Sequence, residues 1–74
     1  MLVVVLKVLS SSGQIVSFAE GRRMVLGGTV RLNGQTVVDP SLEIEINVGD
    51  VLTVGARRRV EITQELLDLL SNGT

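Results

Sequence analysis

The sequence predicts a small α+β domain, in which two N-terminal helices pack on a twisted antiparallel sheet and a further helix follows at the C-terminus. Three observations favour this fold class. A capping pattern opens at Ser17 and precedes a segment with helical spacing. The dipeptide Asn33-Gly34 separates two alternating segments, which is the strongest short signal for a β-hairpin. Residues 62–70 place leucines at helical spacing, with polar residues between them.

The segment after Ser17 is predicted to be a capped helix that ends near Leu26. The Ser17 hydroxyl would accept a hydrogen bond from the backbone N–H of Glu20. Gly27-Gly28 would then end the helix, because glycine adopts a positive φ without a steric penalty. At about 100° per residue, one side of this helix carries the residues that we expect in the core, which are Phe18, Gly21, Met24 and Val25. The opposite side carries Ala19, Arg22, Arg23 and Leu26.

Short strands are predicted for the middle of the chain, four or five in all. Residues 30–32 and 35–38 form the hairpin, and Arg31 points away from its neighbours Val30 and Leu32. Asp39-Pro40-Ser41 is a turn signal, in which Asp39 acts as a hydrogen-bond acceptor. The strict alternation of residues 42–48 predicts another strand, whose core-facing residues would be Leu42, Ile44, Ile46 and Val48. Residues 51–54 form a further strand, and Arg57-Arg58-Arg59 lies at the end of the last one.

The two ends of the chain allow alternatives. Residues 1–9 are almost continuously apolar and rich in valine, which favours a buried strand by propensity. They are too few to span a membrane, and no basic segment precedes them as in a signal peptide, so we expect a cytoplasmic protein without a membrane partner. Residues 63–74 are predicted to be an amphipathic helix that packs on the same domain, with a stripe of Ile62, Leu66, Leu69 and Leu70. An exposed stripe would instead indicate a dimer; we expect a monomer.

Composition excludes several classes of function. The chain has neither cysteine nor histidine, which removes disulfides, thiolate metal sites, ordinary zinc sites and the usual nucleophilic triads. Glu43 and Glu45 form a pair of carboxylates, but no other group completes a glycosidase or metal site around them. We therefore expect no enzyme activity and no cofactor.

The charges are unevenly placed along the chain, although the net charge is only −1. Residues 1–60 contain all seven basic residues and five acidic ones, and residues 61–74 contain the other three acidic residues. Three adjacent arginines at 57–59 repel one another, and an anionic partner would relieve that repulsion. Guanidinium groups bind phosphate in a bidentate geometry.

The stretch from Ser17 to Pro40 resembles the αL RNA-binding domain family, a module of small-subunit ribosomal protein number four, of tyrosyl-tRNA synthetases and of some pseudouridine synthases. The family pattern matches without a gap at Ser17, Glu20, Arg22, Arg23, Gly28, Val30, Asn33, Gly34, Val37, Asp39 and Pro40, and Gly49-Asp50 follows where the family has a Gly-Asp pair. Gly21 departs from the usual alanine, and Leu26-Gly27 replaces a pair that is commonly polar or basic. The resemblance implies that residues 1–62 form the RNA-binding domain and that residues 2–9 are a first helix.

Non-catalytic binding of structured RNA, either ribosomal or transfer RNA, is the function that the resemblance implies. The candidate RNA-binding residues are Lys7, Ser17, Arg22, Arg23, Arg31, Arg57, Arg58 and Arg59. We expect recognition of the phosphate backbone and of RNA shape. We also expect no aromatic residue on the surface, which argues against stacking on single strands. The alternative is a protein-interaction module on the same fold, with a ribosomal or other protein as partner. A β-grasp sulfur carrier is a second possible fold, but such carriers need a Gly-Gly C-terminus, which this chain lacks.

Overall fold

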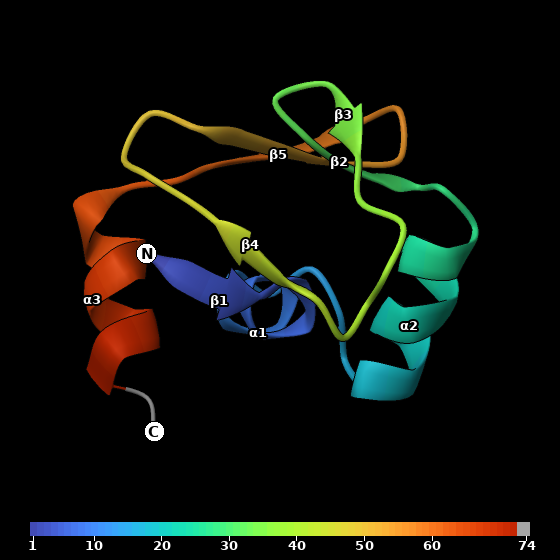
Figure 1. The fold of residues 1–74 in the computed structure, drawn as a ribbon, viewed down its shortest axis with the longest axis horizontal. Coiled ribbons are helices and arrows are strands. Elements are labelled where there is room, and N and C mark those ends of the chain that lie inside the picture. The colour runs from blue at the N-terminus through green and yellow to red at the C-terminus, as the bar shows by residue number, and fades with distance from the viewer. Residues whose placement is uncertain (73–74) are drawn as a thin grey trace.

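The computed structural model describes residues 1–72 and has the predicted α+β architecture (Figure 1). Its elements are β1 (Leu2–Val4), α1 (Val5–Ser11), α2 (Phe18–Leu26), β2 (Val30–Leu32), β3 (Gln35–Thr36), β4 (Glu43–Glu45), β5 (Val51–Val54), β6 (Arg58–Glu61) and α3 (Gln64–Asn72). The strands within these residues form two antiparallel sheets, one in the order β3-β2-β5-β6 and the other β1-β4, rather than the one sheet that we predicted. Figure 1 shows α2 and α3 at opposite ends of the molecule, with α1 between them.

The first nine residues satisfy both alternatives in part. Leu2–Val4 pair with β4, so that Leu2 lies opposite Glu45 and Val4 opposite Glu43. Helix α1 begins only at Val5 and buries four of its residues, Val5, Leu6, Val8 and Leu9. The implied helix is therefore correct from residue 5 and wrong for residues 2–4. Val3 and Val4 are β-branched and favour a strand, and their pairing supplies β4 with hydrogen-bond partners that a helix here would not provide.

Helix α2 begins and ends as predicted. The Ser17 side chain accepts a hydrogen bond from the Glu20 N–H at 3.2 Å. At the other end, Gly28 has a φ of +76°. The Thr29 N–H bonds to the Met24 carbonyl at 3.0 Å and the Gly28 N–H to that of Val25 at 3.1 Å, which is a Schellman motif. This motif directs the chain from the helix straight into β2.

Gly21 allows a close approach between α2, α1 and the loop that joins them. A Cβ atom at this position would lie 2.8 Å from Cδ1 of Ile15 and 2.8 Å from Cδ2 of Leu6, both of which are buried. Gly21 and Val25 face the core as predicted. The prediction was wrong for Phe18, whose side chain is 52% exposed.

Replacing Gly21 with valine is expected to lower the free energy of unfolding by about 2 kcal/mol, because Ile15 and Leu6 must move to admit the added side chain. Ala19→Val on the exposed side of the same helix is the matched control, since it carries the same β-branched penalty without the clash. Urea unfolding followed by circular dichroism measures both variants. Equal losses of stability in the two variants would show that the cost of replacing Gly21 comes from helix propensity and not from packing against Ile15 and Leu6.

The β2–β3 hairpin turns at Asn33-Gly34 as predicted, with φ values of +51° and +84°. The Asn33 side chain also holds a neighbouring turn: its Oδ1 accepts from the Val51 N–H at 2.9 Å and its Nδ2 donates to Asp50 Oδ1 at 3.2 Å. The second carboxylate oxygen of Asp50 accepts from the Asn47 N–H at 2.9 Å. These bonds fix the tip of the hairpin to the start of β5.

The strand register separates an apolar face of the large sheet from a polar one. Val30 lies opposite Val54, and Leu32 lies opposite Leu52, on the face that carries the core. Arg31 lies opposite Thr53, which in turn lies opposite Arg59, on the outer face. The core between the inner face and the helices contains Val5, Val8, Leu9, Val25, Val30, Ile46, Leu52, Val54 and Ile62, each 2% exposed or less.

Two predicted strands are shorter in the structure. The strand expected over residues 35–38 ends at Thr36, although the Val37 N–H still bonds to the Val30 carbonyl at 2.9 Å. The chain then leaves the sheet for the turn at Asp39, whose carboxylate accepts from the Ser41 N–H at 2.9 Å and from the Ser41 hydroxyl at 2.8 Å. These two bonds hold the pKa of Asp39 below its ordinary value.

The alternating segment 42–48 forms a strand only over Glu43–Glu45. Ile46 is fully buried as predicted, but Leu42 and Val48 are each 58% exposed. The reason is the length of the partner strand. Because β1 has only three residues, residues of the segment beyond Glu43–Glu45 have no paired strand to hold them in an extended, alternating conformation. The prediction that Leu42 and Val48 face the core was wrong.

Helix α3 packs against α1 through Leu66 and Leu70, which are 8% and 4% exposed. The Thr63 hydroxyl caps it by accepting from the Leu66 N–H at 3.2 Å. Leu69, predicted in the apolar stripe, is 57% exposed, while Leu67 packs partly against the core. The sequence Asn72-Gly73 is typical of a helix end, but Gly73 lies outside the described residues. Across residues 1–72, every helix is too short or too polar to cross a membrane.

Candidate nucleic-acid interface

Six of the seven basic residues lie on segments at one end of the molecule. We call this set the basic end; it comprises Arg22, Arg23, Arg31, Arg57, Arg58 and Arg59. Figure 1 shows that α2 and the turn between β5 and β6 lie on the same side, opposite α3. The first strand of the hairpin begins shortly after α2 ends, so that Arg31 follows closely from the helix.

Two hydrogen bonds connect the segments that carry these arginines. The Gly55 N–H donates to the Thr29 carbonyl at 2.9 Å, which fixes the β5–β6 turn beside the start of β2. Arg58 Nη1 donates to the Gln14 carbonyl at 3.3 Å, which ties the start of β6 to the loop that precedes α2. These bonds set the relative positions of helix, hairpin and turn.

The cluster at 57–59 begins β6, whereas we predicted that it ends the last strand. Arg57 lies in the turn, and Arg58 is the first residue of β6. Arg59 lies in the outer-face row with Thr53 and Arg31, so that these two arginines point to the same side of the sheet. Since neighbouring strands lie roughly 4.8 Å apart, the backbones of Arg31 and Arg59 are roughly 10 Å apart. Arg58 points to the opposite face, as strand alternation requires.

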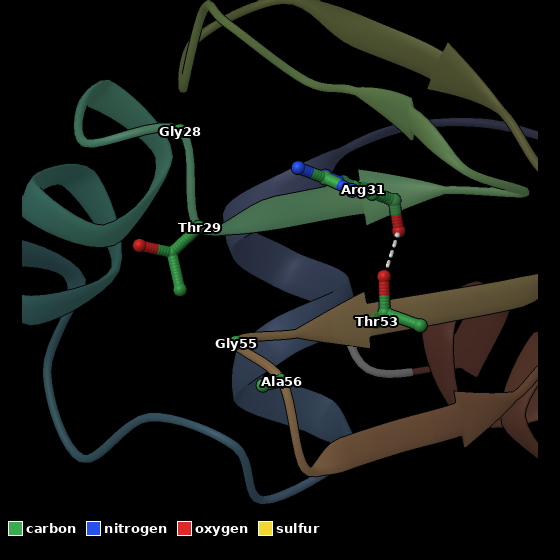
Figure 2. Close-up of a pocket in the computed structure, with 6 residues that line it drawn as sticks. All are labelled: Gly28, Thr29, Arg31, Thr53, Gly55 and Ala56. Carbon is green, nitrogen blue, oxygen red and sulfur yellow. Dashed lines mark hydrogen bonds between the residues drawn. The ribbon is translucent and has the colours of Figure 1, made fainter.

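An open hollow of about 460 Å³ lies between the end of α2 and the β5–β6 turn (Figure 2). Its lining residues are Gly28, Thr29, Arg31, Thr53, Gly55 and Ala56. The Thr53 hydroxyl donates to the Arg31 carbonyl at 3.4 Å. Sequence reasoning did not identify this hollow, because only the pairing of β2 with β5 places Thr53 and Gly55 beside the end of the helix.

The remaining candidate residues occupy different positions. Arg22 and Arg23 are exposed on α2, on the side away from Gly21 and Val25. Ser17 is exposed and caps the same helix, so that its hydroxyl already has a structural role. Lys7 is half-buried on α1 and lies outside the basic end.

Two acidic residues, Glu65 and Asp68, lie on α3 at the other end of the molecule. Glu20 lies on α2, and Glu61 follows Arg59 by two residues on β6, so that these two carboxylates offset only part of the charge of the six arginines. The longest dimension of the molecule is 28 Å, and α2 and α3 lie at opposite ends of it in Figure 1. The Debye length is about 8 Å at physiological ionic strength, so that the acidic helix contributes little to the potential at the basic end. The basic end is therefore locally positive, although the net charge of the chain is −1. Within residues 1–72, no three carboxylates come together as a metal site.

A small α+β domain whose arginines gather at one end has the geometry of a nucleic-acid-binding module. Comparison with known proteins identifies the family. A family model described as the S4 domain matches residues 5–52, and the chain belongs to this family of RNA-binding, αL-type domains.

Several similar curated proteins are tyrosine–tRNA ligases. The chain is 35% identical to the one from Moorella thermoacetica over 52 residues, which is 70% of this chain. It is 39% identical to those from Prochlorococcus marinus over 59 residues and Geobacter sulfurreducens over 57 residues, which is 76% and 77% of this chain. The chain spans only 13% to 14% of the length of these relatives.

Proposed function

We propose that this domain binds structured RNA without catalysing a reaction, and that the basic end contacts the sugar–phosphate backbone. The observation that carries the proposal is the gathering of six arginines on α2, on β2, in the β5–β6 turn and at the start of β6, away from acidic α3. The family supports RNA as the polyanion. Transfer RNA is the first candidate, since the similar proteins are named as tRNA ligases, and ribosomal RNA is the second.

The mechanism is phosphate binding by a rigid, preformed surface. Arg22 and Arg23 extend from a helix with both ends capped, and Arg31 and Arg59 extend from paired strands. Each arginine that neutralises a phosphate releases condensed counterions, which favours binding at low salt. Arg58 acts differently, because its bond to Gln14 holds the α1–α2 loop against β6.

The hollow at the end of α2 adds shape to this charged surface. It is open, and Arg31 lies on its wall together with polar Thr29 and Thr53. A sugar–phosphate backbone can follow such a depression. Shape supplies selectivity in this mechanism, because paired RNA hides its base edges from protein side chains.

The Arg22→Ala/Arg23→Ala double variant tests the proposal. We expect RNA affinity to fall strongly and the slope of log affinity against log salt to decrease by roughly 0.7–0.9 for each phosphate that the protein no longer neutralises. The decrease in affinity should be similar across RNA sequences, because phosphate contacts carry little sequence information. Filter binding of a transfer RNA at several salt concentrations measures both quantities.

Arg22→Lys/Arg23→Lys is the matched control for charge. It should retain most of the salt slope and only part of the affinity, since lysine binds phosphate as a point charge. Circular dichroism controls for the fold, which should not change because both arginines are exposed. Equal affinities and slopes for wild type and the alanine variant would contradict the proposed function.

A specific observation favours protein binding as a second candidate function. An apolar hollow of about 190 Å³ lies beside β3 and β4, and its lining includes Leu32, Val37, Val38, Leu42 and Ile44. Val38 and Leu42 are 70% and 58% exposed. If the domain binds protein rather than RNA, Val38→Ser/Leu42→Ser should abolish the interaction while the arginine variants leave it intact.

A further inference from the structure

Phe18 is the one aromatic residue of the chain, and its side chain is 52% exposed. The core is built from aliphatic side chains instead. Ile15 and Leu6 occupy the space above Gly21 on the buried side of α2, and Phe18 lies one residue after the N-cap, at the outer end of that side. Exposing the largest apolar side chain of the chain costs hydrophobic free energy that the fold does not recover.

The exposed apolar surface continues along α2 and alternates with charge. Phe18, Arg22 and Leu26 are spaced four residues apart, so that they form one stripe, and Leu26 is 68% exposed. Val16, which precedes the N-cap, is 93% exposed. A residue at this position commonly packs on the fourth residue of the helix, but here that residue is Gly21, which has no side chain. An aromatic ring therefore lies uncovered about one helical turn from an arginine.

We propose that Phe18 stacks on an unpaired nucleobase while Arg22 holds a phosphate of the same strand, so that the domain prefers RNA in which a paired stem adjoins an unpaired nucleotide. This inference rests on the proposed function. The expectation that the domain lacks a surface aromatic for stacking is wrong, because the single aromatic residue lies on the surface. Every base has a π-face, and stacking on an aromatic side chain is tolerant of base identity.

An RNA partner fits this stripe better than a protein partner does. A standard protein interface buries about 800 Å² on each side, and the stripe together with Val16 offers one ring and two aliphatic side chains. Arg22 lies within the stripe and Arg23 beside it, so that the local charge complements a phosphate backbone. Phe18 and Arg22 are four residues apart on the helix, which places their Cβ atoms about 5–6 Å from each other. An aromatic ring and a guanidinium are the two groups that bind single-stranded nucleotides.

The test uses two RNA hairpins that differ only in one unpaired nucleotide next to the stem, together with a third in which that nucleotide lacks its base. Phe18→Ala should lower affinity for the RNA with the unpaired base by roughly 5- to 150-fold. The fully paired and the abasic RNA should bind the variant and the wild type equally. The salt slope should not change, because every phosphate contact remains in this variant, whereas Arg22→Ala should decrease the slope.

Two further variants separate stacking from apolar contact. Phe18→Trp should retain the preference for the unpaired base, and Phe18→Leu should abolish it although leucine remains apolar. All three substitutions should leave the thermal unfolding temperature nearly unchanged, since the side chain is exposed.

The possible results are distinct for the two proposals. Suppose that Arg22→Ala/Arg23→Ala weakens binding, whereas the Phe18 substitutions change the affinity for all three RNAs equally. The stacking inference is then wrong and the proposed function stands. If wild type binds none of the RNAs, both are wrong. Equal affinity of Phe18→Ala and wild type for the unpaired-base RNA would leave a protein partner as the explanation of the exposed ring.

Discussion

Replacing Arg22, Arg23, Arg31 and Arg59 together with alanine is expected to raise the Kd for structured RNA at least about 100-fold at low salt. The reason is electrostatic: four phosphate contacts contribute roughly 3 to the salt slope, and without them little counterion release remains to favour binding. The four side chains are exposed, and Arg58 is kept because its bond to Gln14 holds the α1–α2 loop. The measurement is RNA affinity at several salt concentrations, with thermal unfolding as the control for stability.

Neutralising acidic residues at the opposite end provides a matched comparison. Glu65→Gln/Asp68→Asn raises the net charge by two and changes residues of α3 alone, without touching the basic end. Because α3 lies more than a Debye length from α2, we expect the affinity to change by less than about twofold. If this variant instead bound RNA much more tightly, the net charge of the domain would govern binding, and a localised interface would be contradicted.

Removing residues 63–74 is expected to unfold the domain. Leu66 and Leu70 are 8% and 4% exposed and pack against α1, whose apolar face would be open to water without them. Truncating one buried leucine to alanine costs about 2–5 kcal/mol, and a core of this size supplies only about 3–5 kcal/mol. Circular dichroism and urea unfolding of the truncated chain measure the decrease in stability.

Three single substitutions on α3 make this prediction specific. Leu66→Ala and Leu70→Ala should each lower the free energy of unfolding by about 2 kcal/mol or more, and Leu69→Ala by less than about 0.5 kcal/mol, because Leu69 is 57% exposed. Sedimentation of the full chain tests the alternative role of the helix. If Leu69→Ala converted a dimer to a monomer, α3 would be an interface; a stable, monomeric truncated chain would contradict both roles.

The division of the chain at residue 62 stays a prediction. The S4 domain match covers residues 5–52, whereas the core includes Ile62, Leu66 and Leu70. The core therefore extends past the matched segment, and the truncation experiment measures how much of the stability lies there.

The sequence by itself determined the features that depend on a few neighbouring residues. Ser17 caps α2 because its hydroxyl reaches the Glu20 N–H three residues away, and Gly28 ends the helix because it adopts a positive φ. Asn33-Gly34 turns the hairpin for the same local reason. Each of these interactions closes within a few residues, so that residue type and spacing are sufficient to predict it.

Only the tertiary structure decided the features that depend on distant partners. Leu42 and Val48 alternate with buried residues but are exposed, because β4 ends with its three-residue partner β1. Phe18 is exposed because Ile15 and Leu6 occupy the buried side of α2.

The candidate interface depends on distant pairing in the same way. Arg31 and Arg59 are far apart in the sequence, and the register of β2, β5 and β6 places them in one row. Composition could not reveal that the acidic residues of α3 lie at the far end of a 28 Å molecule, because charge separation in space is set by packing and not by order along the chain.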